Sequence, residues 1–377
     1  MARVETTTRG FGCPGKYIQG PGELKRLEEY TSAYGANVFV LIDKRLYDTI
    51  SEQLKKVYEN TSSKLVLDKF TGEVTLGEID RVTKLAAESK PSVLVGIGGG
   101  KTIDTGKAAA ANLQIPFISA PTAASTDAPT SALSVVYTEE GEQTHCIFHK
   151  TSPDIVLVDT EVILTAPVRF LVSGMGDALS TYFEARANAE SDYANYVGKG
   201  YRRTKAAMAI AKLCYDILIE DGLEAKLAAE RGVATEALEN VIEANTLLSG
   251  VGFENTGCAA GHAVNEGLTV LAETHHFFHG EKVAFGTICQ LVLENRPKAE
   301  IEEVVRFCLS VGLPTTLKDL HVEPTYEKLM AVANRAAIEG GIAHAEPFKV
   351  TPEIIYNTIL ATDALTTLYK KQWGYEA

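Results

Sequence analysis

The stretch Ser92-Val-Leu-Val-Gly-Ile-Gly-Gly-Gly-Lys-Thr-Ile-Asp104 decides the fold of this chain. Its first half is apolar enough for a strand buried on both faces, and the alanine-rich segment that follows it favours a helix. Glycines between a strand and a helix let backbone amides approach a phosphate at the positive end of the helix dipole. The stretch therefore predicts a phosphate-binding loop in an α/β protein, with an ordinary tight turn as the alternative.

The loop matches neither of two common phosphate motifs. A Walker A loop would need glycine where Val95 stands, and a dinucleotide fingerprint counted from Gly96 would need glycine where Lys101 stands. The order of strand, loop and helix, together with Lys101, still favours a phosphate loop of another pattern.

Similar strands recur on both sides of this stretch. Apolar, β-rich runs alternate with helical patterns up to about residue 160, at residues 37–43, 64–67, 116–120 and 155–159. Continuous apolar strands separated by helices predict a parallel sheet covered on both faces. Residues 132–148 instead predict a β-hairpin with Gly141 in its turn.

Long amphipathic patterns follow Pro167, and they predict a helical C-terminal half. We expect two domains: an α/β nucleotide-binding domain with a Rossmann-like parallel sheet over residues 1–162, and an all-α domain over residues 163–377. A ligand is expected in a cleft between them.

The composition of the 377 residues narrows the choice of partners. The net charge of −13, without a Lys/Arg cluster, argues against nucleic-acid binding, and no apolar run is long enough for a membrane span. The first residues lack the apolar segment of a secretory signal, and the 6 cysteines are scattered without a Cys-x-x-Cys pair. We therefore expect a cytoplasmic protein with free thiols and a small-molecule partner.

Histidines are concentrated in one part of the predicted helical half. His262 and three later histidines, His275, His276 and His279, account for four of the 8 in the chain. His262 and one of the later three are candidate zinc ligands, and a carboxylate from elsewhere could supply the third. Three protein ligands would leave the metal open to substrate, as in catalytic sites. Ordinary surface or partly buried histidines are the alternative.

Three acidic residues are candidate contacts for a metal, a nucleotide and a substrate. Asp177 follows two glycines beside an apolar helical stripe and could be the missing metal ligand, although such an acid is usually a cap. Asp43 ends a predicted strand, where an acid can bind the adenosine ribose and favour NAD over NADP; loop capping is the alternative. Asp127 lies in the loop 121–131 and could bind substrate hydroxyls, although ordinary turn chemistry also explains that loop.

Five motifs together closely resemble the glycerol dehydrogenase branch of the iron-containing alcohol dehydrogenase family. They are Gly98–Asp104, Pro121–Asp127, Gly174–Asp177, His262 and His279–Gly286. The resemblance covers nearly the whole chain, and the motifs occur in the family's order. It implies the dehydroquinate synthase-like architecture, in which a nucleotide-binding domain and a helical domain flank a catalytic metal.

The resemblance also assigns residues. It implies that Asp177, His262 and His279 are the metal ligands and catalytic residues, and that Asp127 lies at the substrate as a further catalytic residue. Around NAD it places Asp43, Gly99, Gly100, Lys101, Asp104, Thr122, Ser125, Ser131, Leu133 and Tyr137.

Two differences from the family's pattern bear on the metal and the substrate. Iron-using relatives have a fourth ligand, a histidine, where this chain has Thr181, so zinc is favoured over iron. The usual His-Ala-x-His-Asn-Gly is replaced by His262-Ala-Val-Asn265-Glu266-Gly267, which changes groups close to the metal. Residues 342–348 also differ from the glycine-rich segment usual at this place.

The predicted function is the reversible, zinc-dependent oxidation of glycerol to dihydroxyacetone, or of a related vicinal diol to a hydroxyketone, with NAD. A dehydrogenase for another small polyol or hydroxy compound is one alternative. A phosphate-eliminating lyase of the 3-dehydroquinate synthase type is another, but its anionic substrate needs more cations than Lys282 supplies. A non-catalytic protein that binds metal and nucleotide is a third. A homo-oligomer is expected from the resemblance alone.

Overall fold

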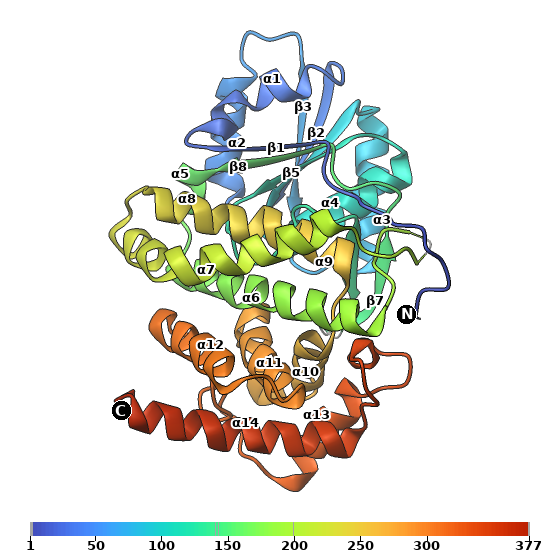
Figure 1. Ribbon diagram of the computed structural model, residues 1–377. Coiled ribbons are helices and arrows are strands. Elements are labelled where there is room, and N and C mark those ends of the chain that lie inside the picture. The colour runs from blue at the N-terminus through green and yellow to red at the C-terminus, as the bar shows by residue number, and fades with distance from the viewer. Residues whose placement is uncertain (1–2, 140, 142, 199, 376–377) are drawn as a thin grey trace. The chain divides into compact units, whose positions relative to one another are not determined.

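The computed structural model describes residues 3–139, 141, 143–198 and 200–375, which form two compact units (Figure 1). The sheet unit comprises residues 12–167 and 232–234, and the helical unit comprises residues 3–11, 168–231 and 235–375. The boundary expected at residue 162 falls within α5 (Thr160–Ile163), and the first residues of the chain group with the helical unit.

The sheet unit contains six parallel strands in the order β1-β8-β5-β4-β2-β3. The strands are β1 (Lys16–Gly20), β2 (Asn37–Asp43), β3 (Lys64–Phe70), β4 (Val93–Gly98), β5 (Phe117–Pro121) and β8 (Ile155–Asp159). The predicted parallel sheet is confirmed. Strand β1 was not predicted from the sequence, because this edge strand is only partly buried and carries polar residues.

Helices cover both faces of this sheet because successive side chains of a strand point to opposite sides. Val38 and Ile42 of β2 pack on one face, and Phe39 and Leu41 pack on the other. The first face is covered by η1 (Glu23–Arg26), α1 (Leu27–Thr31) and α2 (Tyr47–Val57). The second face is covered by α3 (Leu76–Ser89) and α4 (Gly100–Leu113).

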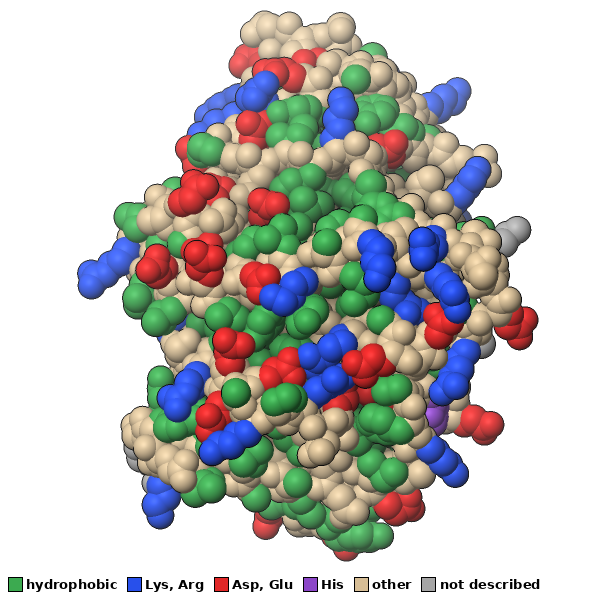
Figure 2. Space-filling view, viewed as in Figure 1, with side chains coloured by type: hydrophobic (Ala, Val, Ile, Leu, Met, Phe, Trp, Pro, Cys, Tyr) green, Lys and Arg blue, Asp and Glu red, His purple; other side chains and the backbone are tan. Residues whose placement is uncertain are grey.

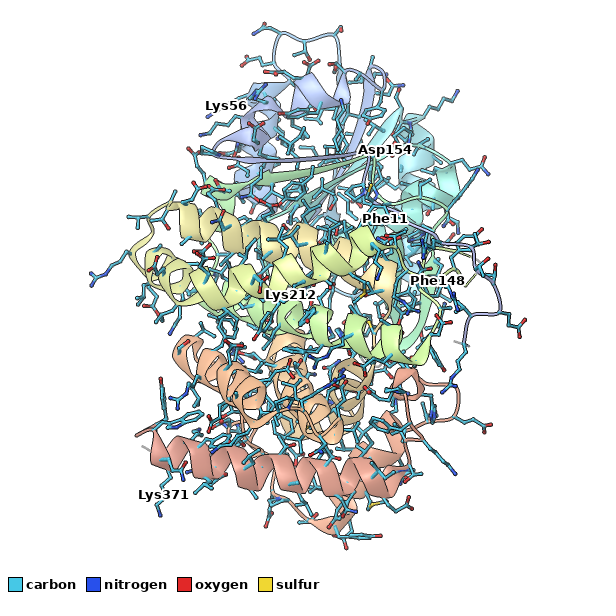
Figure 3. All side chains as sticks on the ribbon, viewed as in Figure 1. Phe11, Lys56, Phe148, Asp154, Lys212 and Lys371 are labelled. Carbon is cyan, nitrogen blue, oxygen red and sulfur yellow. The ribbon has the colours of Figure 1, made fainter. Side chains whose placement is uncertain are left out.

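Loop contacts and a hairpin complete the sheet unit. Asp154, labelled in Figure 3, precedes β8, and its carboxylate accepts a hydrogen bond of 3.0 Å from the backbone N–H of Phe117. The predicted hairpin is confirmed as the antiparallel pair β6 (Leu133–Tyr137) and β7 (Gln143–Phe148). Gly141 has a φ of 87°, which suits glycine in the turn.

The helical unit is built from long helices, as predicted. The longest are α6 (Val168–Ser191), α7 (Lys205–Arg231) and α14 (Pro352–Gln372). The others are α8 (Glu236–Glu243), the π-helical η2 (Ala244–Leu248), α9 (Ser249–Thr256), α10 (Ala260–Leu268), η3 (Ala272–Thr274), α11 (His279–Leu293), α12 (Lys298–Val311), α13 (Tyr326–Ala336) and η4 (Ile342–Ala345). Among the described residues, none of these helices has the length and apolar character needed to cross a bilayer.

One hydrophobic core joins α10, α11, α13 and α14, with α14 (red in Figure 1) running along α11 and α13. Phe285, Leu329 and Ile359 are fully buried in it. On the face shown in Figure 2, acidic and basic side chains lie next to one another over this unit. Within the helical unit, Arg186 and Glu300 form an ion pair with a nitrogen–oxygen distance of 2.5 Å.

Four glycines let α6, α10 and α11 pack with their backbones in contact. A Cβ atom on Gly176 would collide with the carbonyl oxygen of Gly280, and one on Gly280 would collide with that of Ser173. A Cβ atom on Gly286 would likewise meet the carbonyl oxygen of Gly261. We call Gly176, Gly261, Gly280 and Gly286 the glycine seam. It brings the first turns of α10 and α11 close to the middle of α6.

Candidate metal centre

Three donor atoms meet where these helices converge. Asp177 lies in the middle of α6, His262 in the first turn of α10, and His279 at the first residue of α11. The Asp177 Oδ1 atom is 3.4 Å from His262 Nε2 and 3.1 Å from His279 Nε2. The two Nε2 atoms are 3.3 Å apart. The structure thus brings together the three residues that the family resemblance implies as ligands.

The spacing of these atoms fits a tetrahedral zinc ion. Ligands about 2.1 Å from such an ion lie about 3.4 Å from one another. The three observed separations of 3.1 to 3.4 Å match that value. The Asp177 side chain is 1% exposed, whereas that of His279 is 42% exposed. The three donors are thus unequally buried, with Asp177 enclosed and His279 partly exposed.

The charges of the site also favour a cation. Burial opposes the charge of Asp177, but His279 and His262 outweigh it and hold the pKa of that carboxyl below its ordinary range. Burial also disfavours a charged His262, yet Glu184 and Cys258 raise the pKa of its imidazole well above its ordinary value. The site therefore attracts positive charge, whether protons or a divalent cation carry it.

The other two candidate histidines lie elsewhere. His275 Nε2 is 2.9 Å from the carbonyl oxygen of Thr269, and the His276 ring packs against those of Phe277 and His321. His279 is the later histidine whose imidazole reaches Asp177, because it begins α11 and the seam holds α11 against α6.

Sequence reasoning missed the buried polar side chains that surround His262. Glu184, Gln290 and Glu346 are each 0% exposed, and each accepts a backbone hydrogen bond at the start of α10. Glu184 lies seven residues after Asp177, two helical turns along α6, so helical spacing could have revealed it. Glu346 is far away in the sequence, and no local pattern indicates it.

Asn265 and Glu266, which depart from the family's pattern, also lie at this site. Asn265 is 4% exposed, and its Nδ2 atom is 3.3 Å from His279 Nδ1. Glu266 Oε2 pairs with Arg335 Nη2 at 3.2 Å. Burial raises the pKa of Glu266, while Arg335, His262 and His279 oppose that rise.

The candidate nucleotide residues all lie in the sheet unit. The chain leaves β2 toward β3 on one side, returns to β4 and continues to β5 on the other side. In open α/β sheets, nucleotides bind outside the carboxyl ends of strands at such a switch point. Asp43 ends β2 and Gly98 ends β4, and a Cβ atom on Gly98 would lie 3.1 Å from that of Asp43.

The N-terminus of α4 is open at this switch point. Its N-cap, Gly99, supplies no side-chain cap, and a Cβ atom there would meet no described atom within 4 Å. Gly100 begins the helix, and Thr122 donates its backbone N–H to Gly98 at 3.0 Å. An uncapped helix N-terminus with open space in front of it suits an anion.

Lys101 and Asp104 are engaged in contacts within the protein. Lys101 Nζ is 2.5 Å from a Glu73 carboxylate oxygen and 5.3 Å from the centre of the Tyr137 ring. The buried Asp104 pairs with Lys107 at 2.8 Å and accepts the backbone N–H of Val135 at 2.9 Å. Burial raises the pKa of Asp104, and Lys107 opposes that rise. Asp104 thus anchors β6 to α4.

The remaining candidates lie along the segment from β5 to the end of β6. Ser125 and Asp127 are half-buried in the loop between these strands, and Ser131 is fully buried in the same loop. Leu133 begins β6, and Tyr137 ends it. The Lys107 ammonium, which the sequence analysis did not select, donates to carbonyl oxygens of this loop, including that of Ser131 at 3.2 Å.

Known proteins resemble this chain over nearly its whole length. The sequence model described as iron-containing alcohol dehydrogenase matches residues 14–160. A glycerol dehydrogenase from Pseudomonas putida is 46% identical over 95% of this chain and 98% of its own. A glycolaldehyde reductase from Halobacterium salinarum is 41% identical, covering 95% of this chain and 98% of its own. The crystal structure of glycerol dehydrogenase from Schizosaccharomyces pombe has a TM-score of 0.93 at 36% identity, covering 100% of this chain and 95% of that one.

Proposed function

Because the chain belongs to the iron-containing alcohol dehydrogenase family, we propose that it catalyses the reversible oxidation of glycerol, or of a related vicinal diol, to a hydroxyketone with NAD. The observation that carries the proposal is the set of three donor atoms on Asp177, His262 and His279, with mutual distances of 3.1 to 3.4 Å. The relatives named glycerol dehydrogenase support the choice of substrate.

We assign the metal to these three side chains and favour zinc over iron. A bound zinc ion would act as a Lewis acid that lowers the pKa of a substrate hydroxyl. The Thr181 hydroxyl lies 2.9 Å from that of Ser249, so it is engaged on the side of α9. A centre with three protein ligands is consistent with that contact. Asp177 supplies the negative charge of the centre, and the two imidazoles supply neutral lone pairs.

We assign NAD to the switch point of the sheet. The open N-terminus of α4 at Gly99 and Gly100 would hold the pyrophosphate, and Asp43 would accept hydrogen bonds from the adenosine ribose. Lys101 would have to leave Glu73 to reach a phosphate. The proposed neighbours of the cofactor are Thr122, Ser125, Ser131, Leu133 and Tyr137. Asp104 holds β6, which carries Leu133 and Tyr137, against α4. Asp127 is the proposed substrate contact.

Few free cations lie near the metal ligands in the described part of the chain, which disfavours a phosphorylated substrate. Lys282 is 8% exposed, and burial lowers its pKa. Arg335 is paired with Glu266. A dehydroquinate synthase-like elimination needs several cationic groups for its anionic substrate, so an uncharged polyol fits these surroundings better.

The test is a spectrophotometric NADH assay on the purified chain, before and after metal removal by a chelator and after adding zinc back. Glycerol, propane-1,2-diol and dihydroxyacetone should be substrates, whereas longer monohydric alcohols and hydroxy acids should react poorly. Activity that survives complete metal removal, or that is confined to monohydric alcohols, would contradict the proposal. We also propose a homo-oligomer, which light scattering tests, and a cytoplasmic location.

A further inference from the structure

The two nitrogen atoms of the His262 imidazole face different partners. Nε2 points toward Asp177 and His279, whereas Nδ1 lies 2.7 Å from Glu184 Oε2. A neutral imidazole that binds a cation through one nitrogen carries its proton on the other. With a cation bound, Nδ1–H would donate to Glu184, and the lone pair of Nε2 would point into the donor triangle.

Glu184 is held rigidly in place. It is 0% exposed, and its Oε1 atom accepts the backbone N–H groups of Ala259 at 2.9 Å and of His262 at 2.8 Å. Its other oxygen is thereby directed at the imidazole of His262. One carboxylate therefore fixes both the main chain and the side chain of this ligand.

We propose that Glu184 is a positioning residue that fixes the tautomer and ring orientation of His262 so that Nε2 can bind the metal. This inference rests on the metal assignment of the proposed function. Loss of a residue that hydrogen-bonds to a metal ligand, here called an outer partner, typically weakens metal affinity by about 10- to 100-fold. The side chain acts through His262 and contributes no ligand atom of its own.

Two neighbouring side chains cap the start of α10 without contacting the His262 imidazole, so they allow the positioning role to be compared with simple helix capping. Gln290 Oε1 accepts the backbone N–H of Gly261 at 2.9 Å, and Glu346 Oε1 accepts that of Ala260 at 3.2 Å. Within the described part of the chain, neither has a hydrogen bond to the imidazole of His262. Glu346 is as buried as Glu184, and burial together with Glu294 raises its pKa well above the ordinary value. Glu346→Gln is therefore a matched control.

A second reading of the same residues makes Glu184 a ligand. Glu184, Cys258 and His262 each offer a donor atom, and these atoms lie within 4.8 Å of one another. A cation there would displace the Nδ1 proton and compete with the hydrogen bond of 2.7 Å. A second zinc ion per chain, or loss of a single ion in Cys258→Ala, would indicate this second reading, because the positioning role predicts one ion that does not bind Cys258 Sγ.

The experiment compares wild type, Glu184→Gln and Glu346→Gln. Zinc affinity is measured by chelator competition, and the cobalt-substituted proteins are compared by visible absorption. The glutamine at 184 can still accept the backbone N–H groups, but its amide N–H₂ would face Nδ1 and favour the tautomer protonated on Nε2. We expect a 10- to 100-fold weaker zinc affinity and a changed cobalt spectrum for Glu184→Gln, following the effect of other outer partners. Glu346→Gln should stay within about twofold of wild type, because a neutral acid and an amide are similar in shape and hydrogen bonding.

Several results would overturn the inference. They are an unchanged affinity in Glu184→Gln, an equal loss in Glu346→Gln, or two zinc ions bound per wild-type chain. If Glu184→Gln does not fold, Glu184→Asp withdraws the carboxylate by one methylene and should also weaken zinc binding. An unchanged zinc affinity in Glu184→Asp would likewise overturn the inference. A wild-type chain that binds zinc but oxidises no diol would overturn the proposed function alone. A chain that binds neither zinc nor cobalt would overturn both.

Discussion

Replacing Gly280 by alanine should disrupt the proposed metal centre while leaving all three ligand side chains chemically unchanged. The new Cβ atom would lie 2.7 Å from the carbonyl carbon of Ser173 and 2.8 Å from the backbone nitrogen of Asp177, and closer still to the Ser173 oxygen. Ordinary contact begins at 3.4 Å, so α6 and α11 must separate. Moving the closest of these contacts, 1.8 Å to the Ser173 oxygen, out to 3.4 Å requires a shift of about 1.6 Å, well beyond the tolerance of about 0.2 Å in a metal–ligand distance.

The expected result is a chain that folds but binds less metal. Overpacking of this kind costs about 1–3 kcal/mol of unfolding free energy. Zinc content measured by mass spectrometry should fall well below one ion per chain, and NADH production should fall with it. Gly77→Ala, where a Cβ atom would have its nearest neighbour at 3.7 Å, is the control and should keep wild-type stability. Full metal content in Gly280→Ala would refute the idea that the seam sets the donor spacing.

Four further predictions concern single residues. His279→Ala should remove metal and activity together; full turnover of the metal-free variant, measured by NADH absorbance, would contradict the assigned centre. Asn265→Ala should weaken zinc binding about tenfold in a chelator competition, because the imidazole of His279 loses an outer partner. Asp43→Ser should reduce the preference for NAD over NADP, seen as a smaller ratio of the two kcat/KM values, because the acid that repels a 2′-phosphate is gone. Burial, assisted by Lys107, lowers the pKa of His149 to about 4. The folded chain therefore holds this imidazole neutral, and the associated stability is present above about pH 6.5, the ordinary pKa. That stability is lost as the pH falls toward 4. In His149→Gln, the unfolding free energy measured with urea should therefore fall less between pH 6.5 and pH 4 than in wild type.

Most strands of the sheet could be predicted from the sequence because each is an uninterrupted apolar run. Buried strands such as β4 are apolar throughout, whereas β1 carries Lys16 and Gln19 at an exposed edge and gave no such signal. The glycine seam could not be predicted either, since a glycine at a helix crossing looks the same in sequence as one in a loop. Its role appears only when the backbone of the neighbouring helix is in place.

The ligand set shows a similar limit. Residue chemistry narrowed the later ligand to three histidines, and the resemblance chose His279. In the structure, His279 Nε2 lies 3.1 Å from Asp177 Oδ1, whereas His275 and His276 are engaged with Thr269 and Phe277. The contact between Glu346 and Ala260 spans 86 residues of sequence and has no local signature. Lys107, by contrast, lies three residues from Asp104, a helical spacing that could have identified the pair.

The glycine seam would limit which ions the proposed centre can accept. Main-chain contacts between α6, α10 and α11, rather than flexible side chains, fix how far apart the donors sit. Calcium prefers oxygen ligands at about 2.3–2.6 Å and more of them. To admit it, the helices would have to spread and lose their backbone packing, so a centre held by these three donors would disfavour an ion as large as calcium.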